Sequence, residues 1–180
     1  MRKLDATKAL TLGAMCAALT VLCLYAACVL PTGRLALYFL SSLFIYALSG
    51  EEAYGWAVVM FFACCGLGLA IVPNRISLLP YVFLLGHYGI FKPWLDRRMP
   101  DRVVRAALKL LYCNAFFALA VCAAVYAAGF DLATLPLPEF LPLWAAVLLL
   151  QAAFLAFDLL YWFCQRFYDE RVRYAIMPRR

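Results

Sequence analysis

The sequence predicts an all-α integral membrane protein, a bundle of about six transmembrane helices. Of its 180 residues, 68% are hydrophobic and only 14% are charged, whereas an ordinary soluble domain is about half apolar and a quarter charged. A soluble fold of this length has too little interior to hide so much apolar surface. The apolar residues also form runs close to the roughly 20 residues that a helix needs to cross a bilayer. Lipid is therefore the expected solvent for most of the chain.

Helix-breaking and polar residues separate the first three runs. The first ends at Pro31-Thr32-Gly33-Arg34, the second at Ser49-Gly50-Glu51-Glu52, and the third at Pro73-Asn74-Arg75. The second run is short for a span, so we expect it to begin near Pro31 or to thin the bilayer locally. The first run is too long for the apolar region of a signal peptide and is expected to stay attached. The expected helices cover residues 9–30, 33–49 and 53–72.

The last three runs lie around a charged connector at 96–102. The fourth run is expected to reach the surface at Lys92-Pro93-Trp94, and the long, alanine-rich fifth run begins after the connector. A proline-containing loop at 131–139 precedes the sixth. The expected helices cover residues 76–92, 103–129 and 140–165, with a basic tail at 166–180, all in one transmembrane domain, 1–180.

The basic residues predict a cell-membrane protein with both termini in the cytoplasm. With an inside N-terminus, the basic residues of the N-terminus, connector and tail share one side, and the other side receives only Arg34 and Arg75. Cytoplasmic loops are enriched in Lys and Arg in this way. The formal net charge of +6 is then explained by anionic headgroups rather than by nucleic acid, which is not an expected partner.

The lack of catalytic motifs in the sequence favours a protein that is not an enzyme. The chain has no GxSxG, Walker, HExxH or aspartate-rich motif, the patterns that carry hydrolysis or phosphate chemistry. Its 8 cysteines lie within apolar runs and form no CxxC pair. We therefore expect them to be small buried residues that permit close helix packing, with no metal and no cofactor.

Two charged residues lie inside the last two runs, where charge is costly and usually faces protein. Lys109 and Asp158 are almost equidistant from the middle of the loop between these runs. Antiparallel helices would bring them level, and we hypothesise that they pair. The alternative is that Lys109 extends to the headgroups and Asp158 faces water.

Three further polar residues are expected to bond neighbouring helices. His87 lies between Gly86 and Gly89, which allow close helix approach, and a lone histidine there is expected to form a hydrogen bond rather than to catalyse. Asn114 and Gln151 are expected to act as interhelical hydrogen-bonding residues.

The outward loops contain the candidate ligand site. Arg34, Asn74 and Arg75 lie in or beside these loops, with Trp144 within reach. Two arginines on an otherwise cation-poor face suit the carboxylate or phosphate of a small solute. The alternative is that they anchor the chain to lipid headgroups.

Small residues repeat every four positions along the first helix. One stripe comprises Ala9, Gly13 and Ala17, and a second comprises Ala14 and Ala18. Such stripes let another helix pack closely. They serve either packing within the bundle or docking of a partner subunit.

Four features point to a known family: the size, the six expected helices, the cytoplasmic termini and the segment Lys8-Ala-Leu-Thr-Leu-Gly-Ala-Met-Cys-Ala-Ala-Leu19. In these features the chain resembles the substrate-capture (S) subunits of energy-coupling factor (ECF) vitamin transporters. In that family an AxxxA-type stripe on the first helix docks onto a transmembrane scaffold subunit, and cytosolic ATPases supply energy. The resemblance implies docking through Ala14 and Ala18, and a micronutrient site near the outer surface. The histidine-rich N-terminus of nickel and cobalt members is absent.

Two other classes remain open. A non-catalytic membrane assembly protein would use the basic cytoplasmic face to bind anionic lipid or a cytosolic partner. A small lipid-handling protein would use His87, Glu51, Glu52 or Asp158 near the inner leaflet.

Overall fold

The computed structural model describes residues 5–30, 32–128 and 143–172, and within these ranges the chain forms helices and turns but no strand. The predicted all-helical class is therefore confirmed for this part of the chain. Four of the helices are long and apolar enough to cross a membrane. Internal contacts divide the chain into two compact units, residues 1–130 (unit 1) and 131–180 (unit 2), and each is described by itself.

The described part of unit 1 contains five α-helices and two short irregular helices. A 3₁₀ turn, η1, and a π turn, η2, interrupt the fourth apolar run. The elements are α1 (Ala6–Val29), α2 (Arg34–Gly50), α3 (Tyr54–Ile71), η1 (Arg75–Leu78), η2 (Tyr81–Leu85), α4 (Gly86–Arg98) and α5 (Arg102–Ala128). Unit 2 contains α6 (Leu143–Phe167), followed by the π turn η4 (Tyr168–Val172). The tail beyond residue 172 and residues 129–142 lie outside the described ranges.

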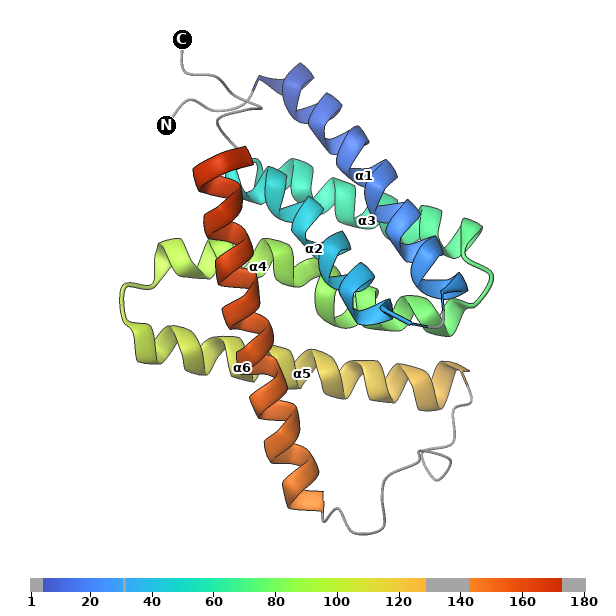
Figure 1. Ribbon diagram of the computed structural model, residues 1–180, viewed down its shortest axis with the longest axis vertical. Helices are drawn as coiled ribbons and strands as arrows, with labels where there is room; N and C mark the ends of the chain where they lie inside the picture. The colour runs from blue at the N-terminus through green and yellow to red at the C-terminus, as the bar shows by residue number, and fades with distance from the viewer. Residues whose placement is uncertain (1–4, 31, 129–142, 173–180) are drawn as a thin grey trace. The chain divides into compact units, whose positions relative to one another are not determined.

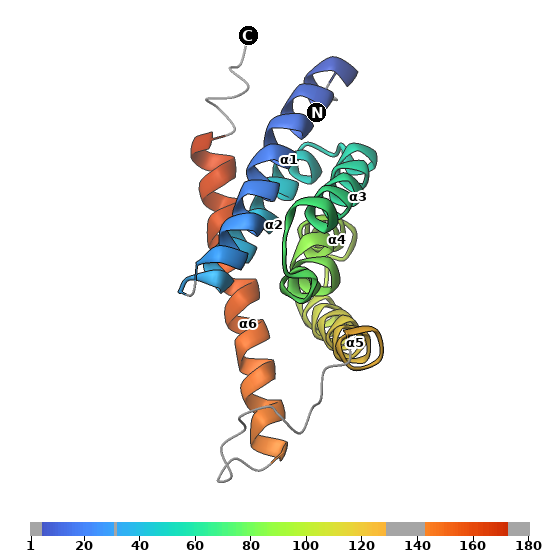
Figure 2. The same ribbon diagram turned by 90° about the vertical axis from the view of Figure 1, so that its right-hand side faces the viewer.

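The core of unit 1 lies between α1, α2 and α3. Helices α1 and α2 lie side by side in both views (Figures 1 and 2) and bury Leu24, Ile45 and Leu48 almost completely. The turn between them needs a glycine, because Gly33 has a φ of 81°, in the left-handed region that side chains disfavour. The large apolar residues left exposed, such as Leu22 and Phe62, are suited to lipid contact.

The fourth segment departs from the single helix expected at 76–92. Its helix does not end at Lys92 but continues through Pro93 to Arg98, and Lys92 is buried. Proline lacks an N–H and leaves the carbonyl one turn earlier without its helical donor. For Pro93 that carbonyl belongs to Gly89, which is buried. A carbonyl left without a donor would be costly inside a membrane.

A hydroxyl from α2 supplies the donor that Pro93 lacks. Ser49 is fully buried and its Oγ donates to the Gly89 carbonyl at 2.7 Å. The same arrangement recurs near Pro80, which cannot donate to the Ser77 carbonyl as the next residue of a 3₁₀ turn would. That carbonyl instead accepts a hydrogen bond from the Tyr38 hydroxyl of α2. Two hydroxyls of α2 therefore support the two interruptions of the fourth segment.

Gly86, at the junction of the π turn and α4, permits a close approach to α3. A Cβ at this position would lie 2.6 Å from Cε2 of Phe61 and 2.9 Å from the carbonyl oxygen of Tyr81. The Gly86 N–H also donates to that carbonyl, closing the π turn. Glycine is therefore required here by both the turn and the neighbouring helix.

Candidate functional site

The end of unit 1 that the sequence predicts to face outward (the outer end) carries Arg34 and Asn74. The Tyr38–Ser77 bond holds η1 against α2, so the start of α2 and residues 74–77 lie at the same end. The Nε of exposed Arg34 donates to the Leu30 carbonyl at 3.1 Å, at the end of α1. The planar guanidinium retains its terminal N–H groups for a carboxylate or phosphate.

Asn74 has a structural task at this end. Its Oδ1 accepts from the Ile76 N–H at 3.0 Å and caps η1, and this bond leaves the Nδ2 group, the donor that an anion would use, uninvolved. Arg75 begins η1, but its side chain lies outside the described part of the chain. The side chain of Trp144, in α6 of unit 2, does so as well. Arg34 and Asn74 are thus the two predicted ligand residues whose side chains are described.

His87 lies in an aromatic cluster between α3, α4 and α5. Its Nε2 is 2.7 Å from the Phe83 carbonyl and its Nδ1 is 3.0 Å from the Tyr112 hydroxyl. Because a carbonyl oxygen only accepts, Nε2 carries the proton, and in the neutral ring Nδ1 accepts from Tyr112. The rings of Phe61 and Phe116 lie 6.1 and 4.1 Å from the imidazole. The two hydrogen bonds fix the ring between α4 and α5.

The end of unit 1 that the sequence predicts to face the cytoplasm (the inner end, residues 49–54 and 91–109) carries three ion pairs between described residues. Lys109 Nζ lies 2.7 Å from Asp96 Oδ1, and Arg105 Nε lies 3.4 Å from the same oxygen. Asp101 caps α5 through the Val103 N–H at 2.9 Å. Asp96 therefore joins α4 to α5, which form a hairpin in Figure 1. The hypothesised Lys109–Asp158 pair joins the two separately described units and stays a prediction.

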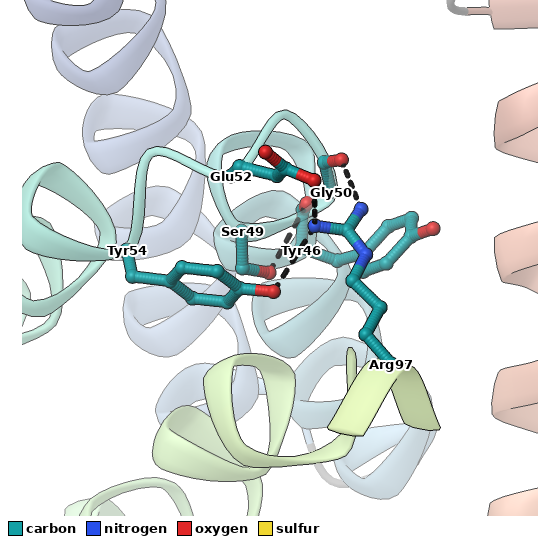
Figure 3. Close-up of polar contacts among 6 residues, drawn as sticks. All are labelled: Tyr46, Ser49, Gly50, Glu52, Tyr54 and Arg97. Atoms are coloured by element: carbon teal, nitrogen blue, oxygen red, sulfur yellow. Dashed lines mark hydrogen bonds and ion pairs between the residues drawn. The ribbon is translucent and has the colours of Figure 1, made fainter. Parts of the chain in front are cut away.

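Arg97 joins the end of α4 to the α2–α3 turn, as Figure 3 shows. Its guanidinium donates to the Gly50 carbonyl and, at 3.1 Å, to the Tyr54 hydroxyl, and it lies 3.5 Å from Glu52 Oε1. A cation at the end of α2 is favourable because helix C-termini are partly negative. Glu52 has a φ of 63°, which costs on the order of 1 kcal/mol for a residue other than glycine. The Arg97 contacts help to hold this turn.

The two small-residue stripes of α1 have different environments. Ala9 is buried, and a Cβ on Gly13 would lie 3.3 Å from Cδ2 of Leu48 in α2. Ala17 is half-buried, and its carbonyl accepts from the Cys64 thiol of α3 at 3.9 Å. Ala14 and Ala18 are exposed. The first stripe thus packs inside unit 1, and the second stripe is open.

The remaining polar residues lie in α5 and α6. Asn114 Nδ2 donates to the Leu110 carbonyl of its own helix at 2.8 Å. Gln151 and Asp158 are half-buried residues of α6, seven positions apart and so on one face of that helix. Within the described ranges, no three His, Cys, Asp or Glu side chains are grouped as a metal site would require.

Comparison with known proteins gives no relative: no protein-family model matches the chain, and no curated protein or solved structure matches it.

Some partners were not predicted from the sequence. The sequence predicts a fourth helix over 76–92 and a connector at 96–102, so it does not predict that Asp96 pairs with Lys109. For the second partner of Asp96 a sequence signal exists, since Asp96 and Arg105 are symmetric about the turn at residues 100–101. The roles of Ser49 and Tyr38 have no such sequence signal. Each hydroxyl compensates for a proline that lies about 40 residues away in the sequence.

Proposed function

We propose that the chain is the substrate-binding membrane subunit of an ECF-type micronutrient uptake transporter. The supporting observation is on α1, where Ala14 and Ala18 are exposed while Ala9 and Gly13 pack within unit 1. Close helix approach in lipid depends on small residues, because it is driven by packing rather than by the hydrophobic effect. The open stripe suits the helix of a transmembrane scaffold subunit.

The proposed topology is six membrane-spanning segments with both termini in the cytoplasm. The six segments are the four helices long enough to cross a membrane, the shorter apolar helix α2, and the interrupted fourth segment. The one-sided distribution of basic residues supports the orientation. A reporter that is active only in the cytoplasm should work at either terminus and fail when it is inserted at residue 74.

The subunit is proposed to bind its solute at the outer end and to perform no chemistry itself. Arg34, with its terminal N–H groups directed to no described acceptor, is the first candidate to hold an anionic group of the solute. Arg75 and Trp144 are proposed to complete this site. Since the chain contains no nucleotide-binding motif, cytosolic ATPases are proposed to supply energy through the scaffold.

The docking proposal is tested by purifying the tagged full-length chain in mild detergent and identifying what it retains by mass spectrometry. We expect the chain to retain a membrane scaffold and ATPases, and Ala14→Trp/Ala18→Trp to lose both. Ala115→Trp/Ala118→Trp is the matched control, because these alanines are exposed on α5. If the α1 variant retains the same partners as the control, docking through this stripe is wrong. Retention of a partner without ATPases would favour a membrane assembly protein.

A further inference from the structure

Apart from buried Lys92, the basic residues at the inner end fall into two groups. Three of them pair with the carboxylates of Glu52 or Asp96: Arg97, Arg105 and Lys109. Arg98 and Arg102 are exposed, and neither forms an ion pair with any residue that the structure describes. Two guanidinium charges at this end therefore have no carboxylate partner among the described residues and can receive an external anion.

An exposed tryptophan accompanies these charges. Trp94 is 41% exposed, and the Arg98 guanidinium carbon lies 5.4 Å from the centre of its ring. The two side chains are one turn apart on α4, and Arg102 follows across the three-residue turn that leads into α5. Tryptophan concentrates at the headgroup level of membranes, where its ring is half in lipid and half in water. The indole and the Arg98 guanidinium thus share a surface suited to the membrane interface, and exposed Arg102 begins the next helix at the same end of unit 1.

We propose that Trp94, Arg98 and Arg102 bind the phosphate headgroup of an anionic phospholipid in the leaflet at the inner end. Guanidinium groups present a planar set of donors that matches phosphate oxygens. An exposed indole beside them packs against the acyl-chain boundary, which a soluble anion would not use. This site is separate from the outer end and from the α1 stripe, and it does not depend on a transport function.

Unit 2 provides a matched control with the same sequence spacing. Trp162 is 45% exposed, and the Arg166 guanidinium carbon lies 5.7 Å from its ring. Arg166, however, pairs with Glu170 at 2.7 Å. The aromatic–arginine geometry is therefore nearly the same, but the charge already has a carboxylate partner.

The test is native mass spectrometry of the delipidated full-length chain with added dioleoyl-phosphatidylglycerol or dioleoyl-phosphatidylcholine. We expect the chain to bind phosphatidylglycerol more tightly, and each of Arg98→Gln and Arg102→Gln to weaken that binding about fivefold. Arg98→Lys/Arg102→Lys should retain part of the preference, since the charge remains. Arg166→Gln should leave it unchanged.

Three results would overturn the proposal. They are equal binding of both lipids by the unaltered chain, an unchanged preference in Arg98→Gln/Arg102→Gln, and an equal loss in Arg166→Gln. Size-exclusion chromatography checks that each variant is folded. If the double variant does not fold, the two single variants decide the question by the same criterion.

Discussion

Replacing Ser49 with alanine removes the hydroxyl that donates to the Gly89 carbonyl at 2.7 Å. Both residues are buried, and Pro93 has no N–H with which to take over the bond. An unsatisfied buried acceptor costs about 1–3 kcal/mol, and hydrogen bonds between membrane helices contribute about 0.6 and up to about 1.7 kcal/mol. We therefore expect Ser49→Ala to lower the free energy of unfolding by about 1 kcal/mol.

The decisive variant is Pro93→Ala, because it restores a backbone N–H one turn after Gly89. In that background the Gly89 carbonyl has a helical donor, and Ser49→Ala should cost less than half as much as in the unaltered chain. The assay is unfolding by sodium dodecyl sulfate in mixed micelles, followed by circular dichroism, for all four members of the double-mutant cycle. If Ser49→Ala costs the same in both backgrounds, the serine does not compensate for the proline.

Three further perturbations test other contacts in unit 1 with the same unfolding assay or with hydrogen exchange. Tyr38→Phe removes the donor to the Ser77 carbonyl and should also cost about 1 kcal/mol; a neutral effect would contradict the role given to this hydroxyl. Gly86→Ala should lower the free energy of unfolding by about 1–3 kcal/mol through overpacking, because its Cβ would lie 2.6 Å from Phe61. Replacing Phe61 with leucine in the same chain should recover part of this loss. Arg97→Gln should change the unfolding free energy by less than about 1 kcal/mol, because its ion pair is partly exposed. The same variant should speed amide hydrogen exchange at residues 51–54. Unchanged exchange would show that Arg97 does not hold the turn.

The helices were predictable because lipid imposes length and hydrophobicity on each span. The long apolar run of α1 and the turn at Gly33 are examples. Helices α1 and α2, on either side of this turn, begin and end within a few residues of the predicted bounds. The fourth segment was less predictable. Proline normally ends a helix, and the continuation of α4 through Pro93 depends on Ser49, a residue 40 positions away on another helix.

For the candidate site, the sequence supplies the residue types and says less about their structural partners. The repeat of small residues marks both stripes of α1, but only packing distinguishes Ala14, which is exposed, from Ala9, which is buried. For Lys109, sequence spacing points to Asp158, a pairing that stays a prediction, and it does not reveal Asp96, whose carboxylate lies 2.7 Å from the Lys109 Nζ. Charge pairing across a bundle depends on which helices are neighbours, and sequence spacing alone does not determine that.

The most direct test of substrate capture is to identify what the folded chain binds. The full-length chain is purified in mild detergent, and small molecules released on denaturation are quantified by mass spectrometry against a parallel preparation of Arg34→Gln. We predict one stoichiometric anionic solute that the variant retains much less well. Release of phospholipid alone, in equal amounts from both preparations, would contradict the proposed transport function.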